Sequence, residues 1–331
     1  MEVSLRSLRF RTEREATWQR LDALLTQIEK RSARSLSDED ILAIPGLYRA
    51  TLSSLSVARA TSLDQALVDY LEALSARAYF FVYGTRTTLV QRVGEFFMST
   101  WPNAVRALWR ETLASGLIMI AGAIGAFFLV RSDPAFFFSF VPGDLAGGRD
   151  PSATTEALRA TLHGEESVEQ SQLSVFATFL FTHNAQIALF AFALGIAFCL
   201  PSVLLIAYNG CTLGAMYAVF DAHGLTVPFS AWIFVHGVTE LFAITLAGAA
   251  GLRIGWAVAF PGALTRLRAA ELAGREGGVV MIGVVIMLFV AGLLEGFARQ
   301  QVQDDVVRGA IAVISGVIWF SYFYARRGPA R

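Results

Sequence analysis

Six long apolar stretches constrain the fold of this chain more than any other feature of its sequence. Hydrophobic residues make up 55% of the chain and charged residues 16%, whereas soluble domains carry about a quarter charged residues. A helix needs about 20 apolar residues to cross roughly 30 Å of hydrocarbon. The stretches are 114–130, 184–206, 210–220, 229–251, 278–294 and 310–324. The sequence therefore predicts an all-α fold, a polytopic α-helical membrane protein with about six transmembrane helices.

Charge asymmetry gives an independent test of this segmentation. Residues 1–113 hold fifteen Arg or Lys against thirteen acids, whereas residues 132–182 hold two arginines, Arg149 and Arg159, against seven acids. Cytoplasmic segments are enriched in basic residues, so we expect the first region inside and the second outside. Six crossings return the arginine-rich segment 252–276 to the inside and leave both termini in the cytoplasm. We therefore retain the short stretch 210–220, which spans fully or forms a re-entrant half-helix.

Residues 1–113 are predicted to form a cytoplasmic helical domain, because the chain begins without a signal-peptide pattern. Apolar residues recur at helical spacing from Trp18 to Ile28, and Ser37 can cap a helix that starts before Asp40. The stretch 55–83 also looks helical. Pro45 interrupts the pattern, and we expect three or four helices in a small bundle.

Two further segments flank the first membrane crossings. Residues 94–102 combine aromatic side chains with Pro102, which suits an interfacial elbow before the transmembrane domain, 114–331. The external segment 132–182 is too long for a turn and should contain some structure. Its last part, 173–181, is either a short surface helix or an earlier start of the second crossing.

An imidazole and a carboxylate lie one helical turn apart within the fourth apolar stretch, at His236 and Glu240. Ionisable groups in hydrocarbon cost roughly 2.5–3.5 kcal/mol each on insertion scales. They therefore persist where another group pairs with them or where an ion or substrate moves past them. Glu240 should therefore be neutral or held by a donor from another helix, and His236 is one candidate. Thr239 either adds its hydroxyl or bonds to its own backbone. The alternative is that these groups simply join helices.

Two amides complete the predicted intramembrane polar cluster. Asn184 lies at the outer entrance of the second stretch, and Asn209 lies at the predicted inner junction before the third, where capping of a helix is the main alternative. Small residues in the same helices predict close helix packing within one subunit, with a partner interface as the alternative. The packing glycines are Gly210, Gly214, Gly237, Gly248 and Gly251.

Several functional classes lack their sequence signatures. His236 and Glu240 lack the second histidine of a His-Glu-x-x-His zinc site, and no phosphate-binding loop or nucleophile elbow is present, so we predict no metal, no cofactor and no catalytic residue. Acids balance the cytoplasmic arginines, which argues against a nucleic-acid partner. Cys199 and Cys211 lie in apolar stretches and do not indicate a disulfide framework.

The order of these motifs resembles the stage II sporulation protein M family of bacterial and archaeal membrane proteins. The resemblance rests on Asn184, then Asn209-Gly210-x-x-x-Gly214, then His236-Gly237-x-x-Glu240, then Ala247-Gly248-Ala249-Ala250-Gly251-Leu252. Leu47-Tyr48-Arg49 and the region from Tyr70-Leu71 to Tyr83 look like the soluble extension of longer members. The chain departs from the family at His183, where a second asparagine is common.

The resemblance implies a multi-pass protein of the bacterial cytoplasmic (inner) membrane. The namesake acts with peptidoglycan-degrading partners during spore formation, a role that need not transfer. Our first hypothesis is a scaffold or component of a cell-envelope complex, with the lipid bilayer and envelope or cytoplasmic proteins as partners and a homo-oligomer left open. The alternative is a transporter, channel or permease in which Glu240 and His236 handle protons or a polar ligand. An intramembrane hydrolase is a third class, without a visible nucleophile.

Overall fold

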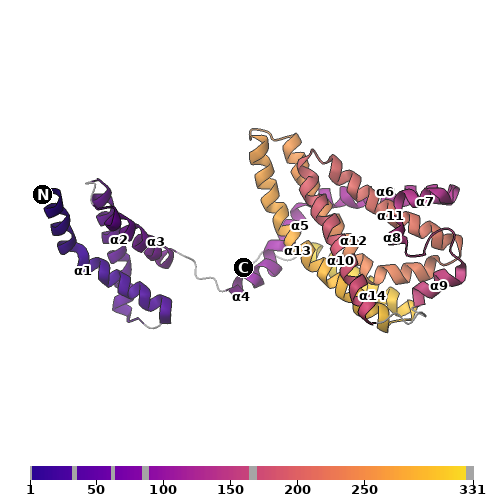
Figure 1. Ribbon diagram of the computed structural model, residues 1–331, viewed down its shortest axis with the longest axis horizontal. Helices are drawn as coiled ribbons and strands as arrows, with labels where there is room; N and C mark the ends of the chain where they lie inside the picture. The colour runs from indigo at the N-terminus through magenta and orange to yellow at the C-terminus, as the bar shows by residue number, and fades with distance from the viewer. Residues whose placement is uncertain (1, 32–35, 61–63, 84–88, 164–169, 326–331) are drawn as a thin grey trace. The chain divides into compact units, whose positions relative to one another are not determined.

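The computed structural model describes residues 2–31, 36–60, 64–83, 89–163 and 170–325. All regular elements of these residues are helices, which confirms the all-α prediction (Figure 1). The chain divides into two compact units, Met1–Leu89 and Val90–Arg331. Each unit has its own apolar core.

The N-terminal unit consists of α1 (Glu2–Arg31), α2 (Asp38–Ala60) and α3 (Gln65–Val82). Its core contains Trp18, Leu21, Ile44 and Leu71, all buried. The predicted cap is confirmed, because Ser37 Oγ accepts a hydrogen bond from the backbone N–H of Asp40 at 3.2 Å. The unit therefore gains its stability from one buried face on each of three helices.

One detail of the N-terminal prediction was wrong, because Pro45 does not interrupt the helix but lies inside α2. The stretch 55–83 is helical as expected, and two helices share it. Helix α2 ends at Ala60, and Asp64 caps α3 by accepting the N–H of Ala66 at 3.1 Å. Periodicity alone detected the helical faces but not the new cap between them.

An arginine joins the first and third helices of this unit. Arg77 donates to Asp22 Oδ1 at 2.5 Å, to Thr26 Oγ1 at 3.1 Å and to Glu29 Oε1 at 3.0 Å. The hydrogen bonds to Glu29 and Asp22 raise the pKa of Arg77 above its ordinary value. The guanidinium therefore stays charged and fixes the pairing of α3 with α1.

The second unit begins with α4 (Leu89–Glu95), a π-helical turn at Phe96–Thr100, and α5 (Trp101–Ala107). The backbone stays helical here, because Pro102 occupies the first turn of α5, where its missing N–H costs little. Trp101 is buried, and its ring packs 5.1 Å from that of Phe323. The predicted elbow therefore inserts its tryptophan into the helix bundle, and its position at a lipid interface stays a prediction.

The remaining long helices of this unit form the membrane domain. They are α6 (Trp109–Ser132), α10 (Gln170–Ala193), α11 (Leu200–Ala222), α12 (Thr226–Ala259), α13 (Arg266–Gln301) and α14 (Asp305–Tyr324). By length and composition, six helices of the described residues could cross a membrane; five lie here and the sixth is α2. The apolar part of α10, Phe181–Ile196, is shorter. The polytopic prediction is confirmed, and the side of the membrane on which each helix ends stays a prediction.

The boundary between the second and third crossings was predicted in the wrong place. Residues 184–206 do not form one crossing, because the chain turns at a 3₁₀ turn (Leu194–Ile196) and at Phe198 and Cys199, whose φ angles are 57° and 68°. Residues 210–220 are instead part of the continuous α11, which is long and apolar enough to cross a membrane. Asn209 consequently lies inside α11 and does not cap a helix.

The segment after α6 is structured, as expected for its length. It contains a 3₁₀ turn (Pro134–Phe136), α7 (Phe137–Phe140), α8 (Gly143–Ala146) and α9 (Thr155–His163). Helix α10 then starts at Gln170 without a separate surface helix at 173–181, so the earlier-start alternative is correct. Arg308 of α14 is buried and donates to the backbone oxygens of Leu162 at 2.9 Å and Val302 at 2.8 Å, which fastens α9 to the start of α14.

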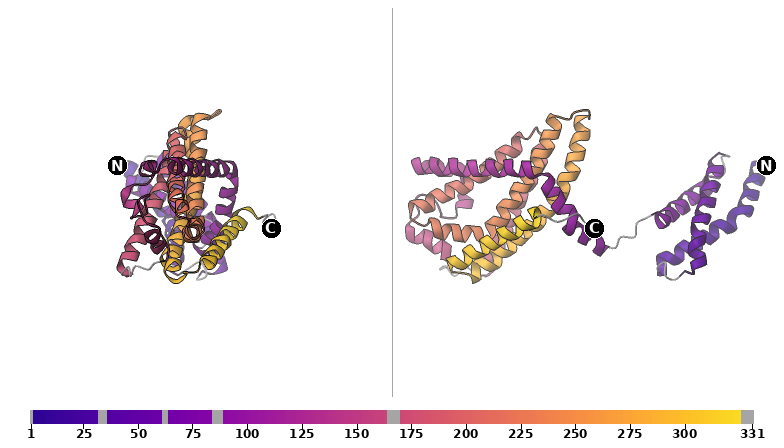
Figure 2. Two further views of the ribbon diagram at one scale, coloured as in Figure 1. Left: turned by 90° about the vertical axis from the view of Figure 1, so that its right-hand side faces the viewer. Right: turned by 180° about the vertical axis from the view of Figure 1, so that it is seen from behind.

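Glycines allow α6 and α11 to lie against each other with their backbones in contact (Figures 1 and 2). A Cβ on Gly210 would overlap the carbonyl of Met119, and one on Gly214 would overlap the carbonyl of Ala123. Small residues are typical of such membrane-helix contacts. The Gly-x-x-x-Gly pair of α11 therefore packs within the subunit.

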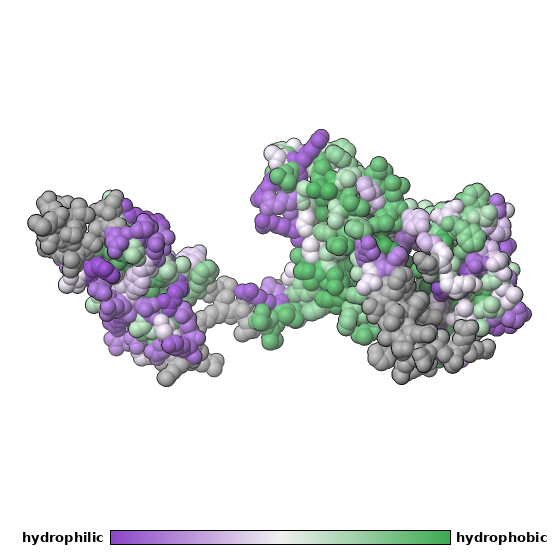
Figure 3. Space-filling model, in the orientation of Figure 1, coloured by the Kyte–Doolittle hydropathy of each residue, from purple (hydrophilic) through white to green (hydrophobic). Residues whose placement is uncertain are grey.

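Apolar side chains cover much of the outer surface of the membrane unit (Figure 3). Exposed examples are Leu117 and Ile124 on α6 and Val313 and Ile318 on α14. The surface becomes hydrophilic at the tip of the α12–α13 hairpin, where the arginine-rich segment lies (Figure 3). This distribution is expected for helices that face lipid along their length and water at their ends.

The glycine contact predicts a matched pair of substitutions. Gly214→Ala should destabilise the folded protein by about 1–3 kcal/mol, because the new methyl group must displace the α6 backbone. Gly125→Ala on α6 is the control, since its Cβ would meet nothing within 4 Å. Thermal unfolding in detergent should show a lower Tm for Gly214→Ala and an unchanged or higher Tm for Gly125→Ala. Equal Tm values would contradict the helix contact.

Candidate functional site

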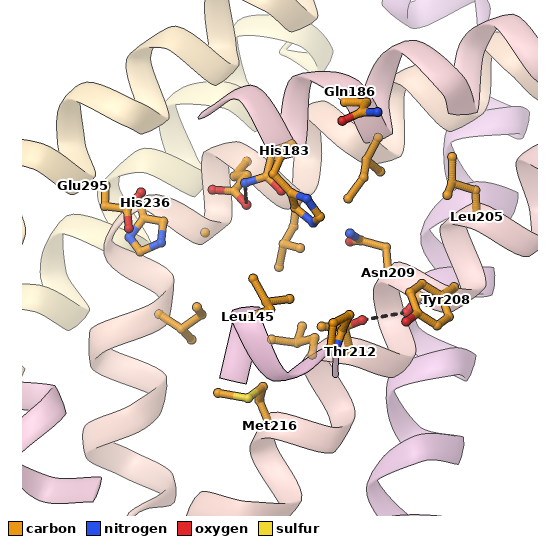
Figure 4. Close-up of a pocket in the computed structure, with 18 of the residues that line it drawn as sticks. Leu145, His183, Gln186, Leu205, Tyr208, Asn209, Thr212, Met216, His236 and Glu295 are labelled. Carbon is orange, nitrogen blue, oxygen red and sulfur yellow. Dashed lines mark hydrogen bonds between the residues drawn. The ribbon is translucent and has the colours of Figure 1, made fainter. Parts of the chain in front are cut away.

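A cavity of about 530 Å³ lies among α10, α11 and α12. The segment around α8 adds to its lining, and α13 contributes one residue, Glu295. Ligand-binding cavities commonly measure about 300–1,000 Å³. Figure 4 shows side chains of these helices surrounding an open central space, with His236 and Glu295 on one side and Asn209 on another. Four residues of the predicted polar cluster line it: Asn184, Asn209, His236 and Glu240.

Glu240 is held by an amide from a neighbouring helix. Asn184 of α10 is buried, and its Nδ2 donates to Glu240 Oε1 at 2.5 Å. The two residues are 56 positions apart in the chain, so the bond joins α10 to α12. A carboxyl group among apolar helices is stabilised by such a donor. His236 was the candidate partner from sequence, but the structure places Asn184 in that role.

A second carboxyl group, Glu295, faces the same cavity. Its side chain is only 4% exposed, and it lines the cavity together with Glu240. In Figure 4 Glu295 lies on the same side of the cavity as the ring of His236. The sequence prediction missed Glu295 because this residue directly follows the apolar stretch 278–294. The continuation of α13 to Gln301 was the missing information.

His236 is buried and packs against an aromatic neighbour on its own helix. Its ring centroid lies 6.3 Å from that of Trp232, with the planes nearly perpendicular at 83°. Trp232, His236 and Glu240 follow at intervals of four residues along α12, and all three line the cavity. One face of α12 therefore supplies an aromatic ring, an imidazole and a carboxyl group in sequence.

Polar groups of α11 line another part of the cavity. Asn209 is half-buried, and Figure 4 shows its amide directed toward the central space. One turn later, Thr212 Oγ1 donates to the carbonyl oxygens of Phe140 at 3.0 Å and Tyr208 at 3.2 Å. These backbone acceptors engage the Thr212 hydroxyl, so it is a poor candidate for a hydrolytic nucleophile.

Thr239 does not join the other members of the predicted cluster. It is buried on a different face of α12, and its Oγ1 accepts a hydrogen bond from Trp319 Nε1 of α14 at 3.0 Å. A threonine inside a helix often bonds to its own backbone, but here the indole N–H provides a donor. Thr239 therefore contributes to the contact between α12 and α14.

The predicted packing glycines of α12 fall into two groups. A Cβ on Gly251 would overlap the carbonyl of Ala191, and a Cβ on Gly248 would meet Ser115 Oγ at 2.5 Å. Gly237 differs, because its Cβ would meet only ordinary contacts at 3.8 Å with two side chains of α12. Gly237 lines the cavity, so its missing side chain leaves space there instead of allowing two helices to approach.

The segment after α6 contributes Arg149 to the cavity lining. Gly147 and Gly148, with φ angles of 52° and 77°, turn the chain after α8 so that Arg149 folds back over it. Arg149 donates to the carbonyls of Ala146 at 2.9 Å and Leu145 at 3.0 Å. Its guanidinium carbon also lies 5.7 Å from the centroid of the Trp232 ring, within cation–π range.

Hydrogen bonds organise the turn that follows Arg149. Asp150 Oδ1 accepts the hydroxyl of Ser152 at 2.6 Å and its backbone N–H at 2.8 Å. These bonds lower the pKa of Asp150 from its ordinary value. Asp150 is therefore a charged group that stabilises this turn at neutral pH.

The donor set of the cavity suits polar or charged ligands. Among the described residues, no group of three or more His, Cys, Asp or Glu side chains could hold a metal ion. The lining combines two carboxyl groups, the imidazoles of His183 and His236, and amides in a largely apolar space. Such a site can bind a cation or exchange protons.

Comparison with known families identifies this membrane unit. The family described as Stage II sporulation protein M matches residues 114–298, more than half of the 331 residues. The chain belongs to the stage II sporulation protein M family. The match includes Asn184, Asn209, His236, Glu240 and Glu295, so the cavity lies inside the family domain. A separate domain of unknown function (DUF8413) matches residues 8–84, within the N-terminal unit.

No curated protein and no solved structure matches the chain. Membership of the stage II sporulation protein M family and the apolar helices together establish a multi-pass membrane protein of that type. Its activity must be inferred from the site itself.

Proposed function

We propose that the membrane domain is a permease in which the cavity handles protons or a small polar ligand. The observation that carries this proposal is the enclosure of Glu240 and Glu295 in one cavity, with Asn184 bound to Glu240. A stabilising contact between helices would need one acid and one donor, with no space beside them. Retention of two acids beside open space is instead expected of an ion or substrate pathway.

The position of the carboxyl groups supports the same proposal. Transporter sites tend to lie near the bilayer midplane, between helices that can move relative to each other. Glu240 follows the start of α12 by fourteen residues, which is about 21 Å at 1.5 Å per residue.

The α10–α11 turn contains two non-glycine residues, Phe198 and Cys199, in the left-handed region. Strain of this kind costs on the order of 1–3 kcal/mol and occurs at segments that change conformation.

A flux assay tests the permease proposal. The full-length protein is placed in liposomes with a pH-sensitive dye inside, and a membrane potential is imposed. The protein should then carry protons in at least one of four conditions: without added solute, or with external choline, glycine or phosphate. Glu240→Gln should reduce this flux at least tenfold because the neutral amide cannot exchange the proton. Val313→Ala, at an exposed position of α14, is the control and should leave it unchanged. Equal flux from folded wild-type and Glu240→Gln protein in all four conditions would contradict the proposal.

The N-terminal unit supports a second role, as the part of an envelope complex that binds other proteins. This unit has its own core and matches a separate family model. Its surface exposes Tyr79 and Phe80 of α3 at 51% and 73%, and exposed aromatic residues are typical of protein interfaces.

Affinity capture from native membranes tests this second role. The full-length protein should recover the same envelope or cytoplasmic partners in replicate experiments, and the double substitution Tyr79→Ser and Phe80→Ser should reduce their recovery several-fold. Leu117→Ser, a similar change on the exposed face of α6, is the control for altered surface polarity. Failure to recover any reproducible partner would contradict a scaffold role.

A further inference from the structure

The cavity is lined by a guanidinium and by two carboxyl groups at separate places. Arg149 lies beside Trp232 of α12. Glu240 follows Trp232 by eight residues on the same helix, and both line the cavity. Since a helix rises 1.5 Å per residue, the two positions are about 12 Å apart along its axis. One wall of the cavity thus runs from a cationic end at Trp232 to an acidic end at Glu240, past the imidazole of His236.

The cationic end is preorganised by the chain around α8. The two left-handed glycines return Arg149 to the end of this short helix, where two carbonyls and the Trp232 ring hold its guanidinium in place. The carboxylate of Asp150 next to it accepts two hydrogen bonds from Ser152. A guanidinium held in this way is suited to the binding of a carboxylate or phosphate group.

The acidic end contains two carboxyl groups, Glu240 and Glu295, that line the same cavity. Asn184 stabilises Glu240 through one oxygen, Oε1. A positively charged group of a ligand would favour the ionised form of a carboxyl group beside it. An ammonium group, with three donors, matches carboxylate acceptors and the carbonyl oxygen of an amide.

Apolar side chains line the space between these ends. They come from all three main helices and from α8, and include Leu145, Ile187, Phe190, Leu205, Leu213 and Met216. Figure 4 shows Leu145 and Met216 beside the central space, with Leu205 farther along its wall. Carbon atoms of a ligand would replace water against this surface, which is favourable.

We propose that the cavity binds a zwitterionic small molecule, with its amine toward Glu240 and Glu295, its acidic group toward Arg149, and a short carbon chain between them. This inference rests on the proposed function of the cavity and specifies its ligand class. Because the two ends of the cavity lie at positions about 12 Å apart along α12, a ligand that reaches both must carry its amine and its acidic group at opposite ends of a short chain. This arrangement corresponds to a small ω-amino acid or a dipeptide-sized compound.

Binding of a matched series of probes tests the proposal. The full-length protein in lipid nanodiscs should bind 5-aminopentanoate at least tenfold more tightly than pentylammonium or pentanoate, each of which keeps one charge. Arg149→Gln should reduce the affinity for 5-aminopentanoate to that for pentylammonium. Glu240→Gln should reduce it to that for pentanoate. Isothermal titration measures all three.

Control variants separate loss of recognition from loss of folding. Arg149→Lys should retain most of the preference for 5-aminopentanoate, and Arg159→Gln, at an exposed position of α9, should retain all of it. Equal affinity for 5-aminopentanoate and pentylammonium in the wild type would overturn the zwitterion proposal and leave a cation-binding cavity. Absence of binding by every probe would also overturn it, while the proton-flux assay judges the permease proposal separately.

Discussion

The membrane unit depends on keeping two carboxyl groups away from lipid. Glu240 and Glu295 come from α12 and α13, and each would be costly on a lipid-facing surface. The structure turns both toward one cavity and supplies Asn184 of α10 as a donor to Glu240. Three helices are thereby constrained by a single polar site, because movement of any one of them changes the environment of a buried acid. This requirement explains why α10, α12 and α13 share one core.

Close backbone contacts make this arrangement possible. Gly210 and Gly214 bring α11 against α6, and Gly251 brings α12 against α10. Since these helices approach without intervening side chains, the side chains on their other faces determine where space remains. Gly237 adds to that space. The same residue type therefore closes the bundle at some positions and leaves the cavity open at another.

The fold was predictable where its physical signal was long and continuous. Apolar length indicated the membrane helices, and the helical spacing from Trp18 onward indicated the N-terminal bundle. The α10–α11 turn was not predictable in the same way, because residues 194–199 are apolar and the left-handed residues are Phe198 and Cys199 instead of glycines. Pro201, in the first turn of α11, was the available signal. The Asn209-Gly210 pair looked like a turn but lies in a helix.

The candidate site shows what a single sequence can and cannot reveal. Ionisable and amide groups in apolar stretches identified Asn184, Asn209, His236 and Glu240, which line one cavity. The direction of each side chain was beyond the sequence: Thr239 faces Trp319, and Glu240 pairs with Asn184. Glu295 and Arg149 were missed as site residues because their roles depend on tertiary contacts between distant segments.

Cysteine accessibility in liposomes tests most directly whether this space is a polar, water-accessible cavity within the membrane. Asn209→Cys would be made in a chain carrying Cys199→Gly and Cys211→Ala, with Val313→Cys on the exposed face of α14 as the lipid-facing control. The account predicts that a charged, membrane-impermeant methanethiosulfonate reagent modifies Asn209→Cys and does not modify Val313→Cys. Modification of neither position, or of both at the same rate, would contradict it.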